Sequence, residues 1–153
     1  MRLLYLVPIE LSHSVPIYSS YMLFTNIVEN MMYELMVRSK FAAAHQLRSV
    51  GGGCEQLHGH TWKVEVFIRG EELKDEGILM DFREVKSIVK KWIDKLDHQY
   101  LNDILADINP TTENLAKYLF KGLGKEINSE RVKLSKVKVW ESDDTCVSYG
   151  KSW

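Results

Sequence analysis

The sequence predicts an α+β fold in which two helices cover one face of a four-stranded antiparallel sheet. Two segments alternate apolar and polar residues with the period of two that is typical of strands. Two central segments repeat apolar residues at helical spacing, and two short alternating segments follow them. The resulting order is strand, strand, helix, helix, strand, strand. Because strands and helices are separated along the chain, this order favours a sheet with its helices packed on one side.

The first two predicted strands span residues 33–45 and 60–69. The odd positions of the first strand and the even positions of the second are mainly apolar, so each strand has one face suited to a core. Glycines 51–53 predict a loop between them. The two apolar rows consist of Tyr33, Leu35, Val37, Phe41, Ala43, Trp62, Val64, Val66 and Ile68.

The two predicted helices each begin at a capping signal. Asp81 and Glu84 have the spacing of a capping box, and the run 109–113 (NPTTE) is typical of a turn followed by an N-cap. Two more strands are predicted over 132–141 and 145–149. The expected buried positions are Phe82, Val85, Ile88, Val89, Trp92, Ile93 and Leu96 in the first helix and Leu115, Tyr118, Leu119 and Leu123 in the second.

Composition excludes several classes of protein. The chain has 153 residues, of which 45% are hydrophobic and 27% charged, which suits one globular domain and excludes a disordered chain. A net charge of −1 gives no general attraction to nucleic acid or to an anionic membrane, and no apolar run approaches the roughly 20 residues of a spanning helix. Two cysteines, Cys54 and Cys146, do not make a secreted disulfide framework, so we expect a reducing, cytoplasmic compartment.

Residues 1–31 differ from the rest of the chain because they carry only three charged residues. A signal peptide would have a basic start, one apolar run and a small-residue cleavage site, whereas here Pro8 and Glu10 interrupt the first apolar run and no such site follows. We therefore expect an N-terminal extension over 1–31 and one domain over 32–153.

The histidines predict a metal site. His58 and His60 flank Gly59, so both imidazoles point to one face of an extended strand. His45 has the parity of the apolar row in the first strand, and His60 has that of the second. If the two strands pair, three imidazoles meet at one end of the sheet and leave a fourth tetrahedral position open, as in catalytic zinc sites. The alternative is a chance His-x-His pair beside a buried core histidine.

Other polar residues are candidates for catalysis or binding. Cys54 lies four residues before His58, where a thiolate near a cation can serve as a base, although a small buried residue is the alternative. Asp97 and His98 form a pair that can move protons, or that caps the end of the helix. Glu141 shares the parity of an apolar row, so it needs a partner such as a ligand with two parallel N–H donors, unless the strand has frayed there.

These motifs together resemble the 6-pyruvoyltetrahydropterin synthase family, and in particular its 6-carboxytetrahydropterin synthase branch, over about residues 33–150. The resemblance implies a tunnelling fold (T-fold) in which three subunits join their sheets into a barrel and two trimers stack, with active sites between subunits. The motifs are Phe41-Ala42-Ala43-Ala44-His45, Cys54-Glu55-Gln56-Leu57-His58-Gly59-His60, Leu96-Asp97-His98, Asn109-Pro110-Thr111-Thr112-Glu113-Asn114 and Val139-Trp140-Glu141.

The resemblance also implies a role for each site residue. The zinc ligands are His45, His58 and His60. The general base is Cys54, which acts with Asp97 and His98. The substrate-binding residues are Glu141, which anchors the pterin ring, Thr112 and Glu55.

The implied reaction is the conversion of 7,8-dihydroneopterin triphosphate to 6-carboxytetrahydropterin, acetaldehyde and triphosphate, on the route to queuosine-type deazapurines. Two other products remain open. A reaction that keeps the side-chain carbons gives 6-pyruvoyltetrahydropterin, and Glu55 matches a branch with the motif Glu-x-x-His-Gly-His that makes a 6-hydroxymethyl product for folate. A zinc-stabilised module that binds pterins without turnover is a further alternative. Such a module would close its metal site with a fourth ligand, for which Cys54 is the candidate.

Overall fold

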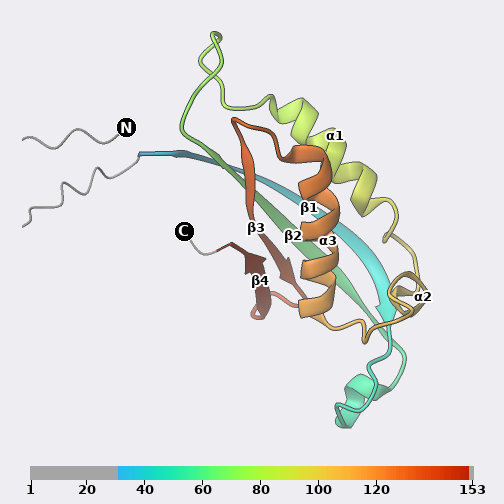
Figure 1. Cartoon of the computed structure of the whole chain (residues 1–153). Helices are drawn as coiled ribbons and strands as arrows, with labels where there is room; N and C mark the ends of the chain where they lie inside the picture. The colour runs from blue at the N-terminus through green and yellow to red at the C-terminus, as the bar shows by residue number, and fades with distance from the viewer. Residues whose placement is uncertain (1–30, 152–153) are drawn as a thin grey trace, which may run out of the picture.

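The computed structural model describes residues 31–151, so the predicted extension over 1–31 lies outside the described residues except for Met31. One antiparallel sheet has the strand order β1-β2-β3-β4, and two long helices pack on one of its faces (Figure 1). This architecture confirms the predicted α+β fold. The elements are β1 (Tyr33–His45), a 3-10 helix η1 (Gly52–Glu55), β2 (His58–Gly70), α1 (Phe82–Ile93), α2 (Leu101–Ile104), α3 (Thr112–Ile127), β3 (Lys133–Trp140) and β4 (Cys146–Gly150).

The strand register places the apolar rows on the helix side of the sheet. Val37 of β1 pairs with Val66 of β2, which in turn pairs with Val137 of β3. Val66 and Val137 are fully buried, and so is Trp62 nearer the histidine end of β2. The alternation that predicted these strands therefore reflects a sheet with one covered face and one open face.

The first helix begins where its cap predicts, but one of its expected core residues is wrong. The side chain of Asp81 accepts a hydrogen bond from the backbone N–H of Arg83, which satisfies a donor at the start of α1. Phe82, predicted to be buried, is 53% exposed, because as the first helical residue it lies at the rim of a shallow apolar cavity beside the start of β1. Leu96 is fully buried, although α1 ends at Ile93.

The two long helices pack against each other at a glycine. A Cβ atom at Gly122 of α3 would lie 2.3 Å from the Trp92 ring of α1, so only glycine admits that ring. The Trp92 indole N–H also donates a hydrogen bond to Glu126 at 2.7 Å. This contact fixes the helix pair above the sheet, with the N-terminus of α3 near the end of the sheet where β1 finishes (Figure 1).

The sequence did not predict the short elements around that end of the sheet. The connection between β1 and β2 contains η1, and α2 follows α1. The chain from His98 to Tyr100 runs beside the outer edge of β1. Ala44 of β1 forms a bridge with Tyr100, and the Ala44 N–H donates a hydrogen bond to the Gln99 carbonyl. Propensity over four residues is too weak a signal to reveal such short helices.

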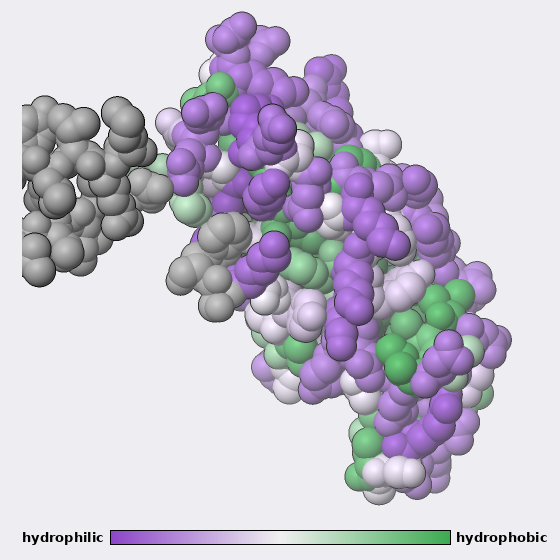
Figure 2. Space-filling view, in the orientation of Figure 1, coloured by the Kyte–Doolittle hydropathy of each residue, from purple (hydrophilic) through white to green (hydrophobic). Residues whose placement is uncertain are grey.

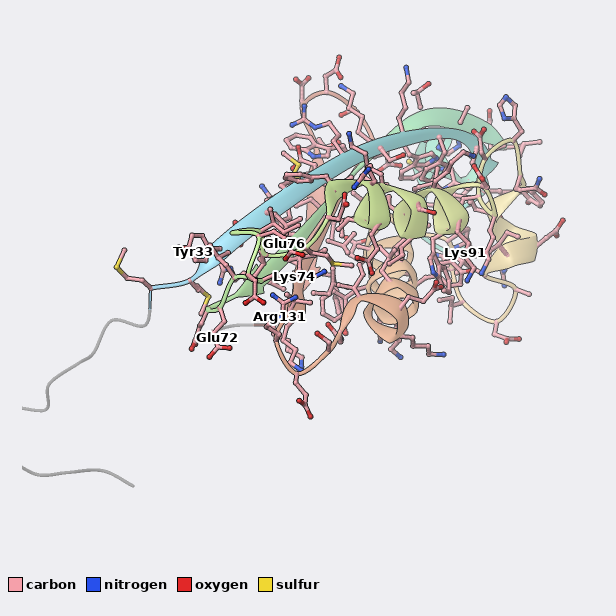
Figure 3. All side chains as sticks on the ribbon, turned by 90° about the horizontal axis from the view of Figure 1, so that it is seen from above. Tyr33, Glu72, Lys74, Glu76, Lys91 and Arg131 are labelled. Atoms are coloured by element: carbon pink, nitrogen blue, oxygen red, sulfur yellow. The ribbon has the colours of Figure 1, made fainter. Side chains whose placement is uncertain are left out.

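The two ends of the sheet differ in chemistry. Charged side chains, among them Glu72, Lys74, Glu76 and Arg131, surround the end where β1 begins (Figure 3), whereas the histidines lie at the opposite end. Hydrophilic residues cover most of the face seen in Figure 2. No helix within residues 31–151 has both the length and the apolar character needed to cross a membrane.

Candidate metal centre and adjoining cavity

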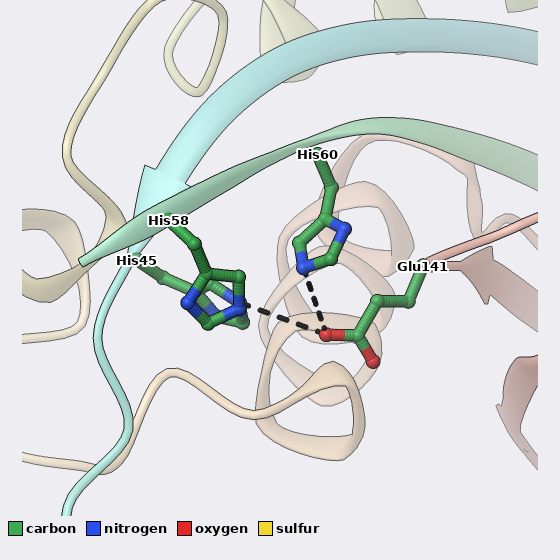
Figure 4. A group of neighbouring side chains, drawn as sticks. All are labelled: His45, His58, His60 and Glu141. Carbon is green, nitrogen blue, oxygen red and sulfur yellow. Dashed lines mark hydrogen bonds and ion pairs between the residues drawn. The ribbon is translucent and has the colours of Figure 1, made fainter. Parts of the chain in front are cut away.

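Three imidazole rings meet at the end of the sheet where β1 finishes (Figure 4). His45 is the last residue of β1 and pairs with His58, the first residue of β2, while His60 pairs with Ala43. The ring centroid of His45 lies 4.5 Å from the ring centroid of His58 and 5.2 Å from that of His60. The parity argument from the sequence therefore holds, because the antiparallel register brings all three rings to the helix-covered side.

Backbone carbonyls fix the orientation of two of these rings. His45 Nδ1 lies 2.9 Å from the Pro110 carbonyl oxygen, and His58 Nδ1 lies 2.7 Å from that of Gln56. A carbonyl can only accept, so each Nδ1 carries the proton and each Nε2 presents its lone pair to the cluster. This outer hydrogen bond is the usual arrangement of a metal-binding histidine.

The donor atoms fit a metal ion. The two Nε2 atoms of His45 and His58 lie 3.0 Å apart, which places two lone pairs face to face unless a cation or proton lies between them. Around a tetrahedral ion with bonds of about 2.0–2.1 Å, two nitrogen ligands lie about 3.3 Å apart. His60 Nε2 is buried and has no hydrogen-bond partner among the described residues. An ion between the rings would satisfy all three nitrogen atoms.

The fourth member of the cluster is Glu141, which follows the last residue of β3. Its Oε1 atom lies 3.3 Å from His60 Nε2 and 3.6 Å from His45 Nε2. Its Oε2 atom accepts a hydrogen bond of 2.8 Å from the Thr112 hydroxyl. The four potential ligand atoms lie within 4.8 Å of one another. Glu141 therefore has polar partners in the folded chain, as its parity with the apolar row requires.

Burial controls the charge of His60. Desolvation lowers the pKa of His60 below its usual 6.5, the Glu141 carboxylate opposes this effect, and the neighbouring His45 and His58 rings add to it. The ring is therefore neutral at physiological pH, which is the form that binds a metal ion.

A cavity of about 440 Å³ adjoins the cluster through Glu141 and Thr112. Its other walls come from the loop after β1 and from the first residues of β4. The lining is Leu47, Val50, Thr111, Thr112, Glu113, Glu141, Thr145, Cys146 and Val147. The cavity combines apolar walls with a few polar groups, which is usual for a small-ligand site, and the Glu141 carboxylate lies between it and the histidines.

Cys54 and Glu55 lie together in η1, outside the cluster. Cys54 is a free, exposed thiol, and no hydrogen bond or ion pair among the described residues joins it to the three histidines. The Glu55 carboxylate accepts hydrogen bonds from the backbone N–H groups of Val50 and Gly51, at 3.0 and 2.9 Å. The side chain of Glu55 thus contacts its own loop.

Asp97 and His98 lie on the outer edge of β1. Asp97 Oδ1 accepts a hydrogen bond of 2.9 Å from the Ala42 N–H, and Asp97 Oδ2 lies 3.0 Å from His98 Nδ1. The Ala42 N–H is the main cause that lowers the pKa of Asp97, and His98 adds to it. His98 adopts a left-handed backbone conformation with φ of 57°, and its side chain is 82% exposed. Asp97 and His98 are therefore in contact with each other, at the outer edge of β1 and outside the histidine cluster.

The structure thus brings together five of the residues singled out from the sequence, namely His45, His58, His60, Glu141 and Thr112. It leaves Cys54, Glu55, Asp97 and His98 outside that cluster. The carbonyls of Pro110 and Gln56 were missed, because a backbone acceptor leaves no signal in side-chain chemistry. Trp62 was predicted only as a core residue, yet it packs against the cluster. Its ring centroid lies 5.2 Å from those of both His45 and His60.

Comparison with known proteins shows the family to which the chain is similar. The profile of the family described as 6-pyruvoyl tetrahydropterin synthase matches residues 34–152. A dihydroneopterin monophosphate aldolase of Pyrococcus furiosus is 37% identical over 114 residues, which cover 74% of this chain and 94% of that protein. A 6-carboxy-5,6,7,8-tetrahydropterin synthase of Haemophilus influenzae is 30% identical and covers 77% of this chain and 99% of that protein.

A solved structure shares the fold. The 6-pyruvoyl tetrahydropterin synthase of Caenorhabditis elegans superposes with a TM-score of 0.72 at 26% identity, over 80% of this chain and 97% of that one. The chain belongs to the 6-pyruvoyl tetrahydropterin synthase family, and its fold is the T-fold of that family. It is an enzyme of the lyase type, like the tetrahydropterin synthases it is similar to.

Proposed function

We propose that this chain binds zinc through His45, His58 and His60 and converts 7,8-dihydroneopterin triphosphate and water to 6-carboxy-5,6,7,8-tetrahydropterin, acetaldehyde and triphosphate. The product would serve the synthesis of queuosine-type deazapurines. The observation that carries the proposal is the junction of the histidine cluster with a cavity of about 440 Å³ through the single carboxylate of Glu141. The similarity to several 6-carboxytetrahydropterin synthases supports the choice of product.

Glu141 and Thr112 would hold the pterin ring. The 2-amino group and the N3–H of a pterin are parallel donors, and a carboxylate accepts such a pair through its two oxygen atoms. The Thr112 hydroxyl, 2.8 Å from Oε2, keeps the carboxylate aimed into the cavity. With the ring bound, both carboxylate oxygen atoms of Glu141 would accept from the pterin, and His45, His58 and His60 would hold the zinc ion.

Cys54, Asp97 and His98 would move the protons. A bound zinc ion supplies Lewis acidity that acidifies the hydroxyl groups of the substrate side chain. The Cys54 thiolate would take a proton from that side chain, and the Asp97–His98 pair would return one. Because this pair projects from the edge of β1 with His98 82% exposed, we place it in the active site of a neighbouring subunit.

Assembly and location follow from the same proposal. β1 and β4 are the two edges of the sheet, and β1 is 13 residues long, of which Ala42 and Ala44 already bond to the chain segment 97–99. We propose that copies of the chain join through these edges as a trimer or a dimer of trimers, because a long open edge strand is otherwise a liability. A Cys54 that acts as a free thiolate requires a reducing compartment, and we propose the cytoplasm.

A second candidate is the 6-hydroxymethyl product made by an aldolase-type cleavage. The relative named dihydroneopterin monophosphate aldolase, at 37% identity, favours it, and Glu55 directly follows Cys54 as in the Glu-x-x-His-Gly-His motif. A 6-pyruvoyl product is the third outcome that the same site chemistry allows.

Product analysis tests the proposal. Purified zinc-loaded protein is incubated with 7,8-dihydroneopterin triphosphate, and the pterins are identified by mass spectrometry, with the His58→Ala variant as the control for contaminating activity. We expect 6-carboxytetrahydropterin and acetaldehyde from the unaltered protein and neither from the variant. A hydroxymethyl or pyruvoyl product would replace the first proposal with one of the other two. Unchanged substrate that nevertheless binds would indicate a pterin-binding module.

A further inference from the structure

The loop that carries Cys54 is built from residues with unusual backbone freedom. Gly51, Gly52 and Gly53 are consecutive, and Ser49, Gly51 and Gly52 adopt left-handed φ values of 58°, 76° and 72°. Glycines lose more conformational entropy on ordering than other residues, so a loop of this composition needs specific bonds to hold one shape.

One side chain provides the bonds inside the loop. Oε1 of Glu55 accepts from the N–H groups of Val50 and Gly51, the two residues at the start of the glycine run. The base of the loop is closed separately, since the Leu47 N–H donates to the Cys54 carbonyl at 2.9 Å and the Gln46 side-chain amide donates to the Glu55 carbonyl at 2.9 Å. Hydrogen bonds to a carboxylate are stronger than those between neutral groups.

One end of this bonded loop reaches the cavity, and the other end carries Cys54. Val50 lines the cavity that contains Glu141, and Cys54 directly precedes Glu55. The Glu55 carboxylate therefore holds the cavity residue Val50, within the same loop that carries the Cys54 thiol. No hydrogen bond or ion pair links this carboxylate to the histidine cluster in the part of the chain that the structure describes.

We propose that Glu55 is a positioning residue, which acts on the reaction by ordering the 50–54 loop and not by contact with substrate. The inference rests on the proposed function, and it differs from the role that the Glu-x-x-His-Gly-His resemblance implies, in which this glutamate does the chemistry in place of a cysteine. A carboxylate that serves as a base needs its charge and its free oxygen, whereas a carboxylate that orders a loop needs an oxygen acceptor.

Two substitutions separate these roles. Glu55→Gln keeps an acceptor oxygen for the two N–H groups but removes the ability to take a proton, while Glu55→Ala removes both. Glu76→Ala is the matched control, because Glu76 is an exposed carboxylate at the opposite end of the molecule (Figure 3). We measure kcat for the pterin product and the hydrogen-exchange rates of the Val50 and Gly51 amides in the zinc-loaded full chain.

We expect Glu55→Ala to speed exchange at both amides about tenfold or more and to lower kcat by a similar factor, as loss of a charged hydrogen-bond acceptor implies. Glu55→Gln should keep kcat and both exchange rates within about threefold of the unaltered chain, because its amide oxygen still accepts, and Glu76→Ala should change neither. Equal loss of kcat in the Gln and Ala variants would overturn the proposal in favour of a base. Unchanged exchange in Glu55→Ala would also overturn it. If the unaltered chain shows no turnover, the proposed function fails, while the exchange rates still decide whether Glu55 orders the loop.

Discussion

The role of Glu141 depends on which neighbouring group its carboxylate binds. Its carboxylate lies within 3.6 Å of two ring nitrogen atoms and accepts a hydrogen bond from Thr112, so it can complete a metal site or anchor a ligand. In the first role the site would be closed by side chains, and in the second it would be open to substrate. Parity in the sequence identified Glu141 as an acidic residue that needs a partner, but it could not reveal that the partners are histidines.

Substitution of Glu141 distinguishes these roles. We expect Glu141→Gln to weaken the binding of 7,8-dihydroneopterin roughly 10- to 100-fold, because one acceptor oxygen becomes a donor that opposes the donors of the pterin. Calorimetric titration of the zinc-loaded variant measures this effect, with Glu84→Gln on the exposed side of α1 as the control. Unchanged affinity would argue against the anchor, and loss of zinc would indicate that Glu141 is a ligand.

Asp97 should make the stability of the protein depend on acidity. Its pKa in the folded chain is lowered by the Ala42 N–H and by His98. Its stabilising effect is therefore fully present above the ordinary carboxyl pKa near 3.8 and is lost as the pH falls through the lower folded value. Urea unfolding should show that Asp97→Ala is less stable than the unaltered chain at pH 7 and that the gap narrows towards pH 3.

The control for that experiment is Asp107→Ala. Asp107 is an exposed carboxylate with no hydrogen-bond partner among the described residues. Its removal should therefore not change how the free energy of unfolding varies with pH. A gap for Asp97→Ala that stays constant from pH 7 to pH 3 would contradict the role assigned to this carboxylate.

At the scale of elements, periodicity predicted every long strand and helix but not the short connections. Alternation over 13 residues reflects burial against the helices, and it survives because one sheet face is covered throughout. Phe82 fitted the helical spacing and is nevertheless 53% exposed, since spacing alone does not indicate where a neighbouring element ends. The positions of Cys54 and Glu55 depend on loop hydrogen bonds for which periodicity holds no information.

The contact between α1 and α3 gives a prediction at this scale. Gly122→Ala would place a methyl group 2.3 Å from the Trp92 ring, so we expect it to lower the free energy of unfolding by about 1–3 kcal/mol despite the better helix propensity of alanine. Thermal or urea unfolding measures the change. Gly124→Ala is the matched control, because its nearest neighbour is a side-chain atom at 3.1 Å, and it should change stability by less than about 1 kcal/mol. Equal effects of the two substitutions would show that the Trp92 contact does not restrict position 122.

At the scale of the whole molecule, the open sheet face and the sheet edges are the surfaces that an assembly of several chains would use. The sheet face opposite the helices carries polar contacts such as Arg38 with Glu65 at 2.6 Å. The outer edge of β1 is bonded to the segment 97–100 only at Ala42 and Ala44 among the described residues, and the Asp97–His98 pair lies at that covered part. The sequence alone could suggest an assembly only through family resemblance, because edge strands are a property of the folded sheet.

Removal of the first 31 residues tests how the whole molecule is organised. We expect a chain that begins at Met32 to keep its melting temperature and its oligomeric state, because the family match begins at residue 34 and the buried core residues that the structure describes run from Leu35 to Val139. Light scattering coupled to size-exclusion chromatography should give three or six copies for both chains. A strongly lowered melting temperature would show that the segment 1–31 belongs to the domain, and a monomer would contradict the proposed edge pairing.

The most direct test concerns the coordination of the metal by β1 and β2. X-ray absorption spectroscopy of the zinc-loaded protein, unaltered and as Cys54→Ala, reports the type of each ligand atom. We expect three nitrogen neighbours at about 2.0–2.1 Å with oxygen in the remaining position, the same spectrum in the variant, and loss of turnover in the variant alone. A sulfur neighbour at about 2.3 Å that disappears in Cys54→Ala, or failure of the unaltered chain to take up zinc, would contradict the account.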